Sequence, residues 1–229
     1  MKVLAIGAHP DDIEIFMLGF LLACQNRKDE IFLAVATDGA KGKVLKYPDL
    51  VKTRKEESIK ALKFLAEPFF FNFPDGDLLS SIGAQSKIKD YIATIEPDLI
   101  LTHSPEDYHT DHTALSHFVK EAVGFRCPIL YSDTLMGVNF YPDYYIDITP
   151  YFKKKLSSIL QHKSQDPQKF AYATKLLNRF RSAQCNAPDG HYAEAFRADK
   201  RFPYTEIRSL LPPAPPLRKF YKSLSDSMI

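Results

Sequence analysis

The sequence predicts an α/β fold, a Rossmann-like three-layer sandwich with a mostly parallel sheet. Short apolar runs alternate along the chain with longer segments of helical periodicity, and this alternation is typical of βαβ units. Polar clusters directly follow two of the apolar runs. Because ligands bind at the carboxyl ends of the strands in an open parallel sheet, we expect the active site at that edge.

The expected strands and helices follow one another in order along the chain. Each expected strand is an apolar run that stops at a turn signal, and these runs are residues 2–8, 31–36, 68–73, 99–102, 128–132 and 145–148. Each expected helix is a longer segment, and these segments are about residues 15–26, 50–66, 84–96, 114–123, 149–162 and 167–185. The near-continuous apolarity of residues 15–26 predicts a buried helix, and Thr149 and Pro150 supply a cap and a first-turn proline.

Length and composition indicate one ordinary globular domain. The chain has 229 residues, of which 45% are hydrophobic and 25% charged. We assign residues 1–210 to a single domain and residues 211–229 to a proline-rich, basic C-terminal tail. Since the chain has 30 basic and 28 acidic residues, its net charge gives no indication of a nucleic-acid partner.

Cysteine content and hydropathy bear on the compartment. Cys24, Cys127 and Cys185 have no metal-binding spacing, so we expect reduced thiols in a cytoplasmic protein. No run approaches the roughly 18 apolar residues of a transmembrane segment. The sequence leaves the oligomeric state open, with a homo-oligomer among the options.

The first polar cluster, His9-Pro10-Asp11-Asp12, follows the first expected strand. Imidazole and carboxylate groups can hold a divalent cation and can also move a proton. Pro10 restrains the turn, so His9 and Asp12 can converge while Asp11 points elsewhere. The alternative is a helix N-cap made by Asp11 or Asp12, and taken alone the cluster fits either interpretation.

The second cluster, His109-Thr110-Asp111-His112, follows the strand at residues 99–102 and opens a helix. Three ligands, His9, Asp12 and His112, together with water would make the open four-coordinate arrangement of catalytic zinc, although ferrous iron suits the same ligands. Asp11 is then free to act as general base. His109, one turn from His112, can stabilise an oxyanion and donate a proton to a leaving group, and Asp111 can orient one of the imidazoles.

Together the two clusters resemble the signature motifs of the LmbE/PIG-L family of metal-dependent N-deacetylases. The resemblance implies a zinc hydrolase that removes the acetyl group from an N-acetylglucosamine-type sugar, a small-molecule substrate, with the metal and catalytic roles given above. It also implies substrate-binding roles for four residues: Arg54, Asp75, His191 and Tyr192. The segment Ile15–Phe20 departs from the family, where many members have a glycine-rich helix start.

Each of these implied substrate contacts has a structural alternative. Arg54 can be an ordinary surface arginine, and Asp75 fits the turn signature Pro74-Asp75-Gly76-Asp77. His191 and Tyr192 can belong to a loop before an edge strand. The triplet Lys163-Ser164-Gln165 is also similar to one in sugar-deacetylating relatives.

Two other functional classes remain for comparison. A nucleotide-binding Rossmann protein would need Gly-x-Gly spacing in the first βα turn, where this chain has carboxylates that repel phosphate. A noncatalytic metal- or sugar-binding module would use the same ligands but would not need Asp11 or His109. The sequence does not choose among N-acetylated substrates.

Overall fold

Seven strands form one sheet in the computed structural model, which describes residues 1–42, 47–200 and 206–218. The strands are β1 (Lys2–Gly7), β2 (Glu30–Thr37), β3 (Phe69–Phe73), β4 (Leu99–Thr102), β5 (Ile129–Ser132), β6 (Tyr144–Asp147) and β7 (Ala193–Ala198). Their order is β3-β2-β1-β4-β5-β7-β6. The first five strands in that order are parallel, and the β5–β7 and β7–β6 pairs are antiparallel. The predicted fold class is confirmed.

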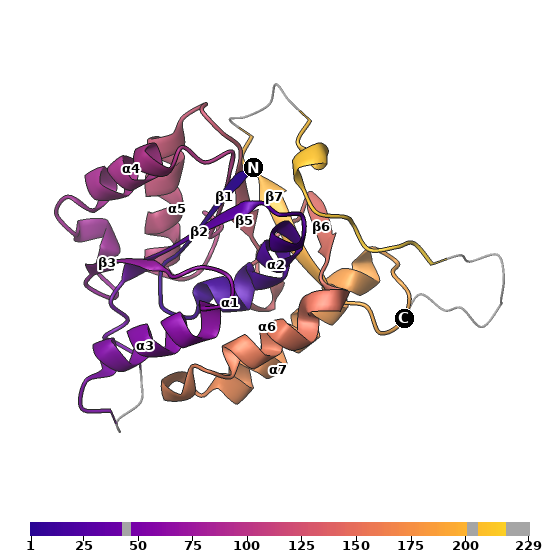
Figure 1. The fold of residues 1–229 in the computed structure, drawn as a ribbon, viewed down its shortest axis with the longest axis horizontal. Coiled ribbons are helices and arrows are strands. Elements are labelled where there is room, and N and C mark those ends of the chain that lie inside the picture. Colours follow the sequence, from indigo (N-terminus) through magenta and orange to yellow (C-terminus); the bar gives the residue numbers. More distant parts are fainter. Residues whose placement is uncertain (43–46, 201–205, 219–229) are drawn as a thin grey trace.

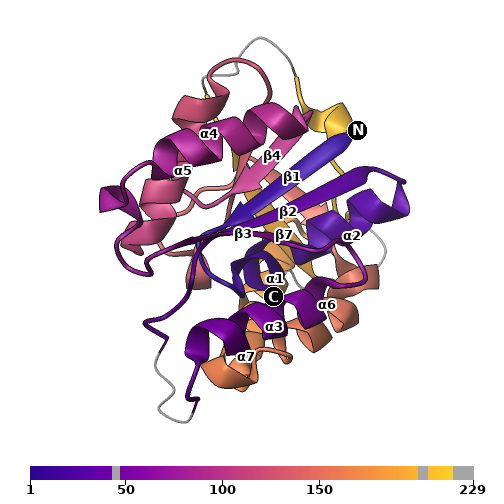
Figure 2. The ribbon, with the colours of Figure 1, turned by 60° about the vertical axis from the view of Figure 1, so that its left-hand side comes forward.

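Helices cover both faces of this sheet (Figures 1 and 2). In the described residues the α-helices are α1 (Asp12–Phe16), α2 (Leu18–Asn26), α3 (Leu50–Leu62), α4 (Ala84–Ile95), α5 (Thr110–Val123), α6 (Phe152–Ile159) and α7 (Pro167–Gln184). One face packs against α1, α2, α3 and α6, with α7 against α6, and the other face packs against α4 and α5. The short 3-10 helices are η1 (Leu78–Ser80), η2 (Leu135–Gly137), η3 (Thr149–Tyr151), η4 (Lys163–Gln165) and η5 (Arg208–Leu210).

The two apolar cores lie on opposite faces of the sheet. In β1, Val3 and Ala5 point into the core beneath α1 and α2, whereas Leu4 and Ile6 point into the core beneath α4 and α5. Successive side chains of a strand alternate between faces, so a strand buried on both faces must be apolar throughout. This explains the uninterrupted apolar runs in the sequence.

The sheet has a topological switch point between β1 and β4. The chain moves from β1 to β2 and β3 on one side, and from β4 to β5 on the other. The loops that follow β1 and β4 therefore lie side by side at the carboxyl edge, where ligands bind in open α/β sheets.

The expected single helix over residues 15–26 is instead two helices. Met17 leaves helical geometry at φ −132°, and the backbone N–H groups of Gly19 and Phe20 donate to the carboxylate of Glu194, both at 2.8 Å. Lys155 Nζ donates to the same carboxylate at 2.6 Å. A buried carboxylate thus binds the first free N–H groups of α2, which favours a new helix start there.

Gly19 is required at this second helix start. A Cβ atom on Gly19 would lie 2.4 Å from a side-chain carbon of Ile148 and 2.8 Å from Oε1 of Glu194. The segment Ile15–Phe20 lacks the glycine-rich helix start of many family members, but it keeps a glycine at position 19, where the chain packs too closely for a side chain.

Two further expectations need correction. The helix α3 ends at Leu62, short of residue 66, and β7 is not an edge strand, because it lies between β5 and β6 and pairs with both. The edge strand on that side of the sheet is β6.

The described part of the C-terminal tail lies against the domain. Pro213 O accepts the N–H of Asp147 at 2.9 Å, and Arg218 N–H donates to Asn186 O at 2.9 Å. Of the basic stretch at residues 218–222, residues 219–222 lie outside the described residues. Within the described ranges, no helix is both long and apolar enough to cross a bilayer.

Candidate active site

A cavity of about 420 Å³ opens at the carboxyl edge of the sheet, between the loops after β1 and β4. Its charged lining comes from both histidine clusters, from the loops after β2 and β3, and from α3: His9, Asp11, Asp12, Lys41, Arg54, Asp75, His109 and His112. Its apolar lining comes from α1, η2 and the start of α7: Ile15, Phe16, Leu135 and Phe170. The cavity therefore joins a charged floor to an apolar wall.

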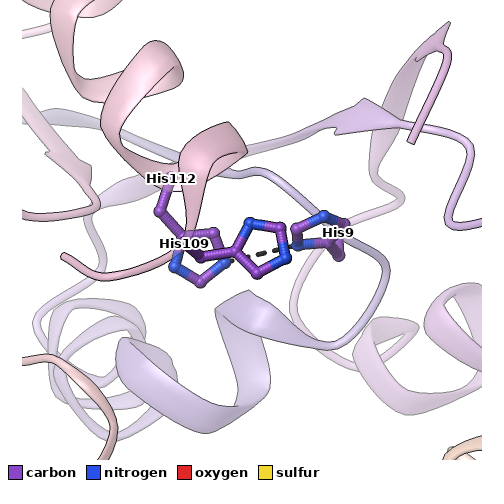
Figure 3. Close-up of side chains that lie close together, drawn as sticks. All are labelled: His9, His109 and His112. Atoms are coloured by element: carbon purple, nitrogen blue, oxygen red, sulfur yellow. Dashed lines mark hydrogen bonds between the residues drawn. The ribbon is translucent and has the colours of Figure 1, made fainter. Parts of the chain in front are cut away.

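Three side-chain atoms form a nearly equilateral triangle on this floor. His9 Nδ1 lies 3.3 Å from Asp12 Oδ2, His112 Nε2 lies 3.4 Å from Asp12 Oδ2, and the two ring nitrogens are 3.3 Å apart. Figure 3 shows the imidazoles of His9 and His112 approaching each other from separate elements, with His109 beside them. The structure thus brings His112 next to His9 and Asp12, although His9 and His112 are 103 positions apart in the sequence.

The outer nitrogen of each imidazole faces carboxylates. His9 Nε2 lies 3.2 Å from both Asp111 Oδ2 and Asp75 Oδ1, and His112 Nδ1 lies 3.0 Å from Asp107 Oδ2. A carboxylate there holds the proton on the outer nitrogen. The lone pairs of His9 Nδ1 and His112 Nε2 are therefore left to face the triangle.

This arrangement fits a zinc ion. Ligand distances of about 2.0–2.2 Å in a tetrahedral site place the ligand atoms about 3.3–3.6 Å apart, which is the spacing of the triangle. Three protein ligands at the floor of an open cavity match a catalytic site, where the fourth position stays open. The same donors accommodate ferrous iron.

The electrostatic environment of these groups also favours a cation. Burial opposes a charged His112, but Asp12 and Asp107 outweigh it and raise the pKa of His112 to about 9. Burial also opposes a charged His9, yet hydrogen bonds to Asp111 and Asp12 raise its pKa well above 6.5. For Asp12, burial raises the pKa, but His112 and His103 hold it well below 3.8. Protons or a divalent cation can supply the positive charge that the cluster favours.

Asp111 connects His9 to the loop after β3. Its carboxylate accepts the N–H groups of Gly76 at 2.6 Å and Leu78 at 3.1 Å, besides its contact with His9. Burial raises the pKa of Asp111, but the bonds from His9 and the two backbone N–H groups lower it to about 2. Asp111 therefore stays ionised, and its carboxylate fixes the orientation of His9. Its backbone N–H donates to His109.

Asp11 turns away from the triangle toward Arg54. Arg54 Nη2 donates to Asp11 Oδ1 at 3.1 Å, and Arg54 Nη1 donates to Gly39 O at 2.9 Å. Arg54 is 4% exposed, so it is not the surface arginine of the alternative interpretation. Within the described chain, Asp11 Oδ2 has no hydrogen-bond partner, and it is available in the cavity.

Asp75 lies between the guanidinium group of Arg54 and the imidazole of His9. Its Oδ2 accepts the N–H of Lys41 at 2.8 Å and lies 4.0 Å from Arg54 Nη1, while Oδ1 faces His9. Burial raises the pKa of Asp75, but the hydrogen bond and the charge of His9 lower it overall. Asp75 is thus held by the protein more tightly than a simple turn residue requires.

His109 has a fixed tautomer. The backbone N–H of Asp111 donates to His109 Nδ1 at 3.2 Å, so His109 caps α5 with that nitrogen and the proton of the neutral ring is on Nε2. Burial lowers the pKa of His109, and the charges of His9 and His112 lower it further. At neutral pH His109 is therefore a hydrogen-bond donor through Nε2.

Sequence reasoning missed two residues next to the triangle. Asp107 holds His112, and its other oxygen accepts the N–H of His109 at 3.0 Å. His103 stacks on His112 with ring centroids 3.7 Å apart, and its Nε2 lies 3.0 Å from Asp12 Oδ2. Asp107 could have been suspected because it is a carboxylate in the loop that delivers His109.

His103 is a geometric rival to His9 as the third ligand, because its nitrogen also lies close to Asp12 and His112. His103 is fully buried, however, and does not line the cavity. Its outer nitrogen has no hydrogen-bond partner in the part of the chain that the structure describes. His9 lines the cavity and has an oriented outer nitrogen, so His9 better fits an open catalytic site.

His191 and Tyr192 do not come to the cavity. His191 Nδ1 contacts Pro188 O at 3.1 Å, and Tyr192 stacks on Phe152 with ring centroids 3.6 Å apart. Of the triplet in η4, Gln165 lines the cavity. The preceding His162 binds Glu14 at 2.7 Å and so ties η4 to α1.

Known proteins resemble this chain over most of its length. An uncharacterized deacetylase of Escherichia coli, YaiS, is 29% identical in an alignment of 180 residues that covers 71% of this chain and 90% of that protein. Diacetylchitobiose deacetylase of Thermococcus kodakarensis is 25% identical in an alignment of 189 residues that covers 73% of this chain and 71% of that protein.

A solved structure shows the same fold. N,N'-diacetylchitobiose deacetylase from Pyrococcus horikoshii, in complex with its inhibitor MPG, matches with a TM-score of 0.77 at 23% identity, over 92% of this chain and 88% of that one. Residues 4–123, just over half of the chain, match the PIG-L family, described as GlcNAc-PI de-N-acetylase. Both histidine clusters lie in this stretch. The chain therefore belongs to the PIG-L family of deacetylases, as the two clusters predicted.

Proposed function

We propose that this protein is a zinc-dependent hydrolase that removes the N-acetyl group from an N-acetylglucosamine-type sugar or sugar conjugate. One observation carries the proposal: the triangle of His9, Asp12 and His112 at the floor of an open cavity, with the carboxylate of Asp11 next to it and turned away from it. Membership of a deacetylase family and the two diacetylchitobiose deacetylase relatives support the substrate class.

His9, Asp12 and His112 would hold the metal. A bound zinc ion would lower the pKa of water to about 7 and polarise the acetyl carbonyl. Asp111 and Asp107 keep the ring protons on the outer nitrogens, so both inner lone pairs are directed to one point.

Asp11 is the proposed general base. Its Oδ1 is held by Arg54, and its Oδ2 would accept the proton of the attacking water. The same oxygen can then return that proton to the departing amine nitrogen. Arg54 thus acts as a positioning residue for Asp11, in addition to the substrate contact that the family resemblance implies.

His109 is the proposed donor to the oxygen that becomes negative during the reaction. Its Nδ1 is occupied by the N–H of Asp111, so the ring presents a proton at Nε2. This bond favours the oxyanion role over proton donation to the amine, because a cationic His109 would lose its bond to the helix N-terminus. We propose that Asp75 and Arg54 contact the hydroxyl groups of the sugar, and that the wall of Ile15, Phe16, Leu135 and Phe170 packs against its apolar faces.

Replacement of Asp11 by Asn tests the proposal against a noncatalytic binding module. N-acetylglucosamine, diacetylchitobiose and glucosaminide conjugates are assayed for release of the free amine, with and without a chelator. We expect the Asp11→Asn variant to keep its bound zinc, measured by elemental analysis, and to lose about 10²- to 10⁴-fold in rate. Asp90→Asn, the same substitution on the exposed face of α4, should keep full activity.

Two results would contradict the proposal. Amine release that survives complete removal of the metal would exclude a metal-dependent reaction. An Asp11→Asn variant as active as the wild type would exclude Asp11 as the base.

A further inference from the structure

The even charge of the whole chain conceals a local excess of basic residues. Residues 151–184, which contain α6, η4 and α7, hold eight Lys and Arg residues and one acidic residue, Asp166. The rest of the chain holds 22 basic and 27 acidic residues. The helical hairpin is therefore strongly positive on a domain that is otherwise slightly negative.

Six of the eight cations reach solvent. Lys155 and Arg181 are buried and pair with Glu194 and Asp133, at 2.6 Å in both cases. The remaining six are exposed or half-buried: Lys153, Lys154, Lys163, Lys169, Lys175 and Arg179. The described part of the chain gives Lys169, Lys175 and Arg179, all on α7, no carboxylate partner, so this helix presents uncompensated charge.

The same helix exposes a row of large apolar side chains. Tyr172, Leu176 and Phe180 are 66%, 43% and 54% exposed, and their spacing of four residues places them on one face of α7. Exposed Met136 and Val138 belong to the η2 segment, which packs against α7. Single exposed apolar residues are ordinary, but a continuous row beside basic residues indicates a binding surface.

We propose that the exposed face of α7 docks on an anionic lipid surface. Lysine and arginine side chains next to aromatic and aliphatic ones on a helix are the composition of interfacial helices, in which the apolar row enters the headgroup region and the cations bind anionic lipids. α7 lies at the outer edge of the molecule in both ribbon views (Figures 1 and 2). Its exposed side chains are therefore accessible from outside the domain.

A second copy of this chain fits the face less well. A two-fold contact would place α7 against α7 or its near surroundings, and the cations of one copy would then meet those of the other without an acid on either helix. Like charges in contact disfavour association. Anionic lipid complements the whole face.

The docking face adjoins the cavity. Phe170, in the first turn of α7, and Gln165, just before it, both line the cavity. A protein docked through α7 would therefore hold the cavity close to the lipid headgroups. The inference rests on charge and exposure alone and does not depend on the proposed reaction.

Vesicle cosedimentation of the full chain tests the inference. Vesicles of phosphatidylcholine alone are compared with vesicles that contain phosphatidylglycerol, at low and high salt. We expect binding only to the anionic vesicles, weakened by salt. Each basic side chain near an anionic bilayer contributes about fivefold, so the triple variant Lys169→Gln, Lys175→Gln, Arg179→Gln should bind roughly 100-fold more weakly.

A matched variant controls for total charge. Lys28→Gln, Lys87→Gln, Lys89→Gln removes three exposed cations elsewhere, two of them from α4 on the opposite face of the sheet, and should bind like the wild type. The variant Tyr172→Ser, Leu176→Ser, Phe180→Ser should lose binding while it keeps its charge. Circular dichroism and thermal unfolding verify that each variant is folded.

Three outcomes would overturn the inference. The wild type could fail to bind anionic vesicles at low salt, or both charge variants could lose binding equally, which would indicate a nonspecific effect of net charge. A homo-oligomer that the serine variant dissociates, without vesicle binding by the wild type, would assign the face to a second copy of the chain.

Discussion

Asp107 is the residue whose replacement most directly tests the proposed metal site. Its Oδ2 accepts from His112 Nδ1, and its Oδ1 accepts from the backbone N–H of His109. Both oxygens therefore face N–H donors. Asn at this position has one acceptor oxygen, so the Asp107→Asn variant must lose one of the two bonds, and it loses the negative charge in either orientation.

The expected loss follows from what this charge does. Burial raises the pKa of Asp107, but its bond to His112 outweighs burial and lowers the pKa, so the carboxylate is ionised and makes His112 Nε2 a stronger electron-pair donor. Removal of such a carboxylate behind a metal-binding histidine typically weakens metal affinity 10- to 100-fold, or about 1.4–2.7 kcal/mol. The proposed base Asp11 is untouched, so the chemistry should survive once metal is bound.

Zinc titration in metal-buffered solution measures both effects. We expect the Kd for zinc of Asp107→Asn to rise 10- to 100-fold, and its rate of amine release to approach the wild-type rate at saturating free zinc. Asp11→Asn should show the opposite pattern, with normal affinity and no recovery. Glu106→Gln makes the same chemical change one residue away, at a carboxylate that pairs with Arg197, and should alter neither quantity.

Unchanged zinc affinity in Asp107→Asn would refute the argument, because it would mean that His112 does not bind the metal through Nε2. A lost rate that saturating zinc does not restore would also refute it, since Asp107 would then act in the reaction itself.

Two further predictions concern stability. Lys155→Met leaves the carboxylate of Glu194 buried without its cation, so the free energy of unfolding, measured in urea, should fall by about 3–5 kcal/mol. The double variant Lys155→Met, Glu194→Gln should be more stable than Lys155→Met alone. A larger loss of stability in the double variant would contradict this explanation. The pKa of Asp111 falls from 3.8 to about 2 on folding, so in chelator-treated protein its contribution is complete above about pH 5 and diminishes as the pH falls through 4 toward 2. The stability difference between wild type and Asp111→Asn should therefore shrink as the pH falls from 5 to 3, and a difference that does not change over this range would refute the assignment.

The sequence predicts those features that depend on neighbouring residues. The apolar runs identify the parallel strands, and the position of each polar cluster after a strand predicts that His9 and His112 lie on the same edge of the sheet. What the sequence does not reveal depends on packing between distant segments. Glu194 binds the start of α2 although it lies 175 residues further along the chain. No local sequence pattern predicts that bond or the interruption between α1 and α2 at Met17.

The placement of His191 and Tyr192 has a similar cause. The resemblance put both at the cavity, but β7 pairs antiparallel with β5 and β6, Tyr192 stacks on Phe152, and His191 contacts Pro188 O. Asp107 was missed for the opposite reason. It lies close to His112 in the sequence, yet a carboxylate in a loop has many ordinary explanations until its partner is seen.

The adjacent carboxylates Asp11 and Asp12 can serve different functions because they have different partners. Asp12 Oδ2 accepts the N–H of His9 at 2.7 Å and so faces the triangle, whereas Asp11 is bound by Arg54. If Asp11 turned inward, its carboxylate would supply a fourth ligand and close the position that a catalytic metal needs open. Arg54 is buried and anchored on Gly39 O, so the cation that holds Asp11 is itself fixed. For the proposed hydrolysis, Arg54, which keeps Asp11 out of the triangle, is therefore as important as the three residues that form the triangle.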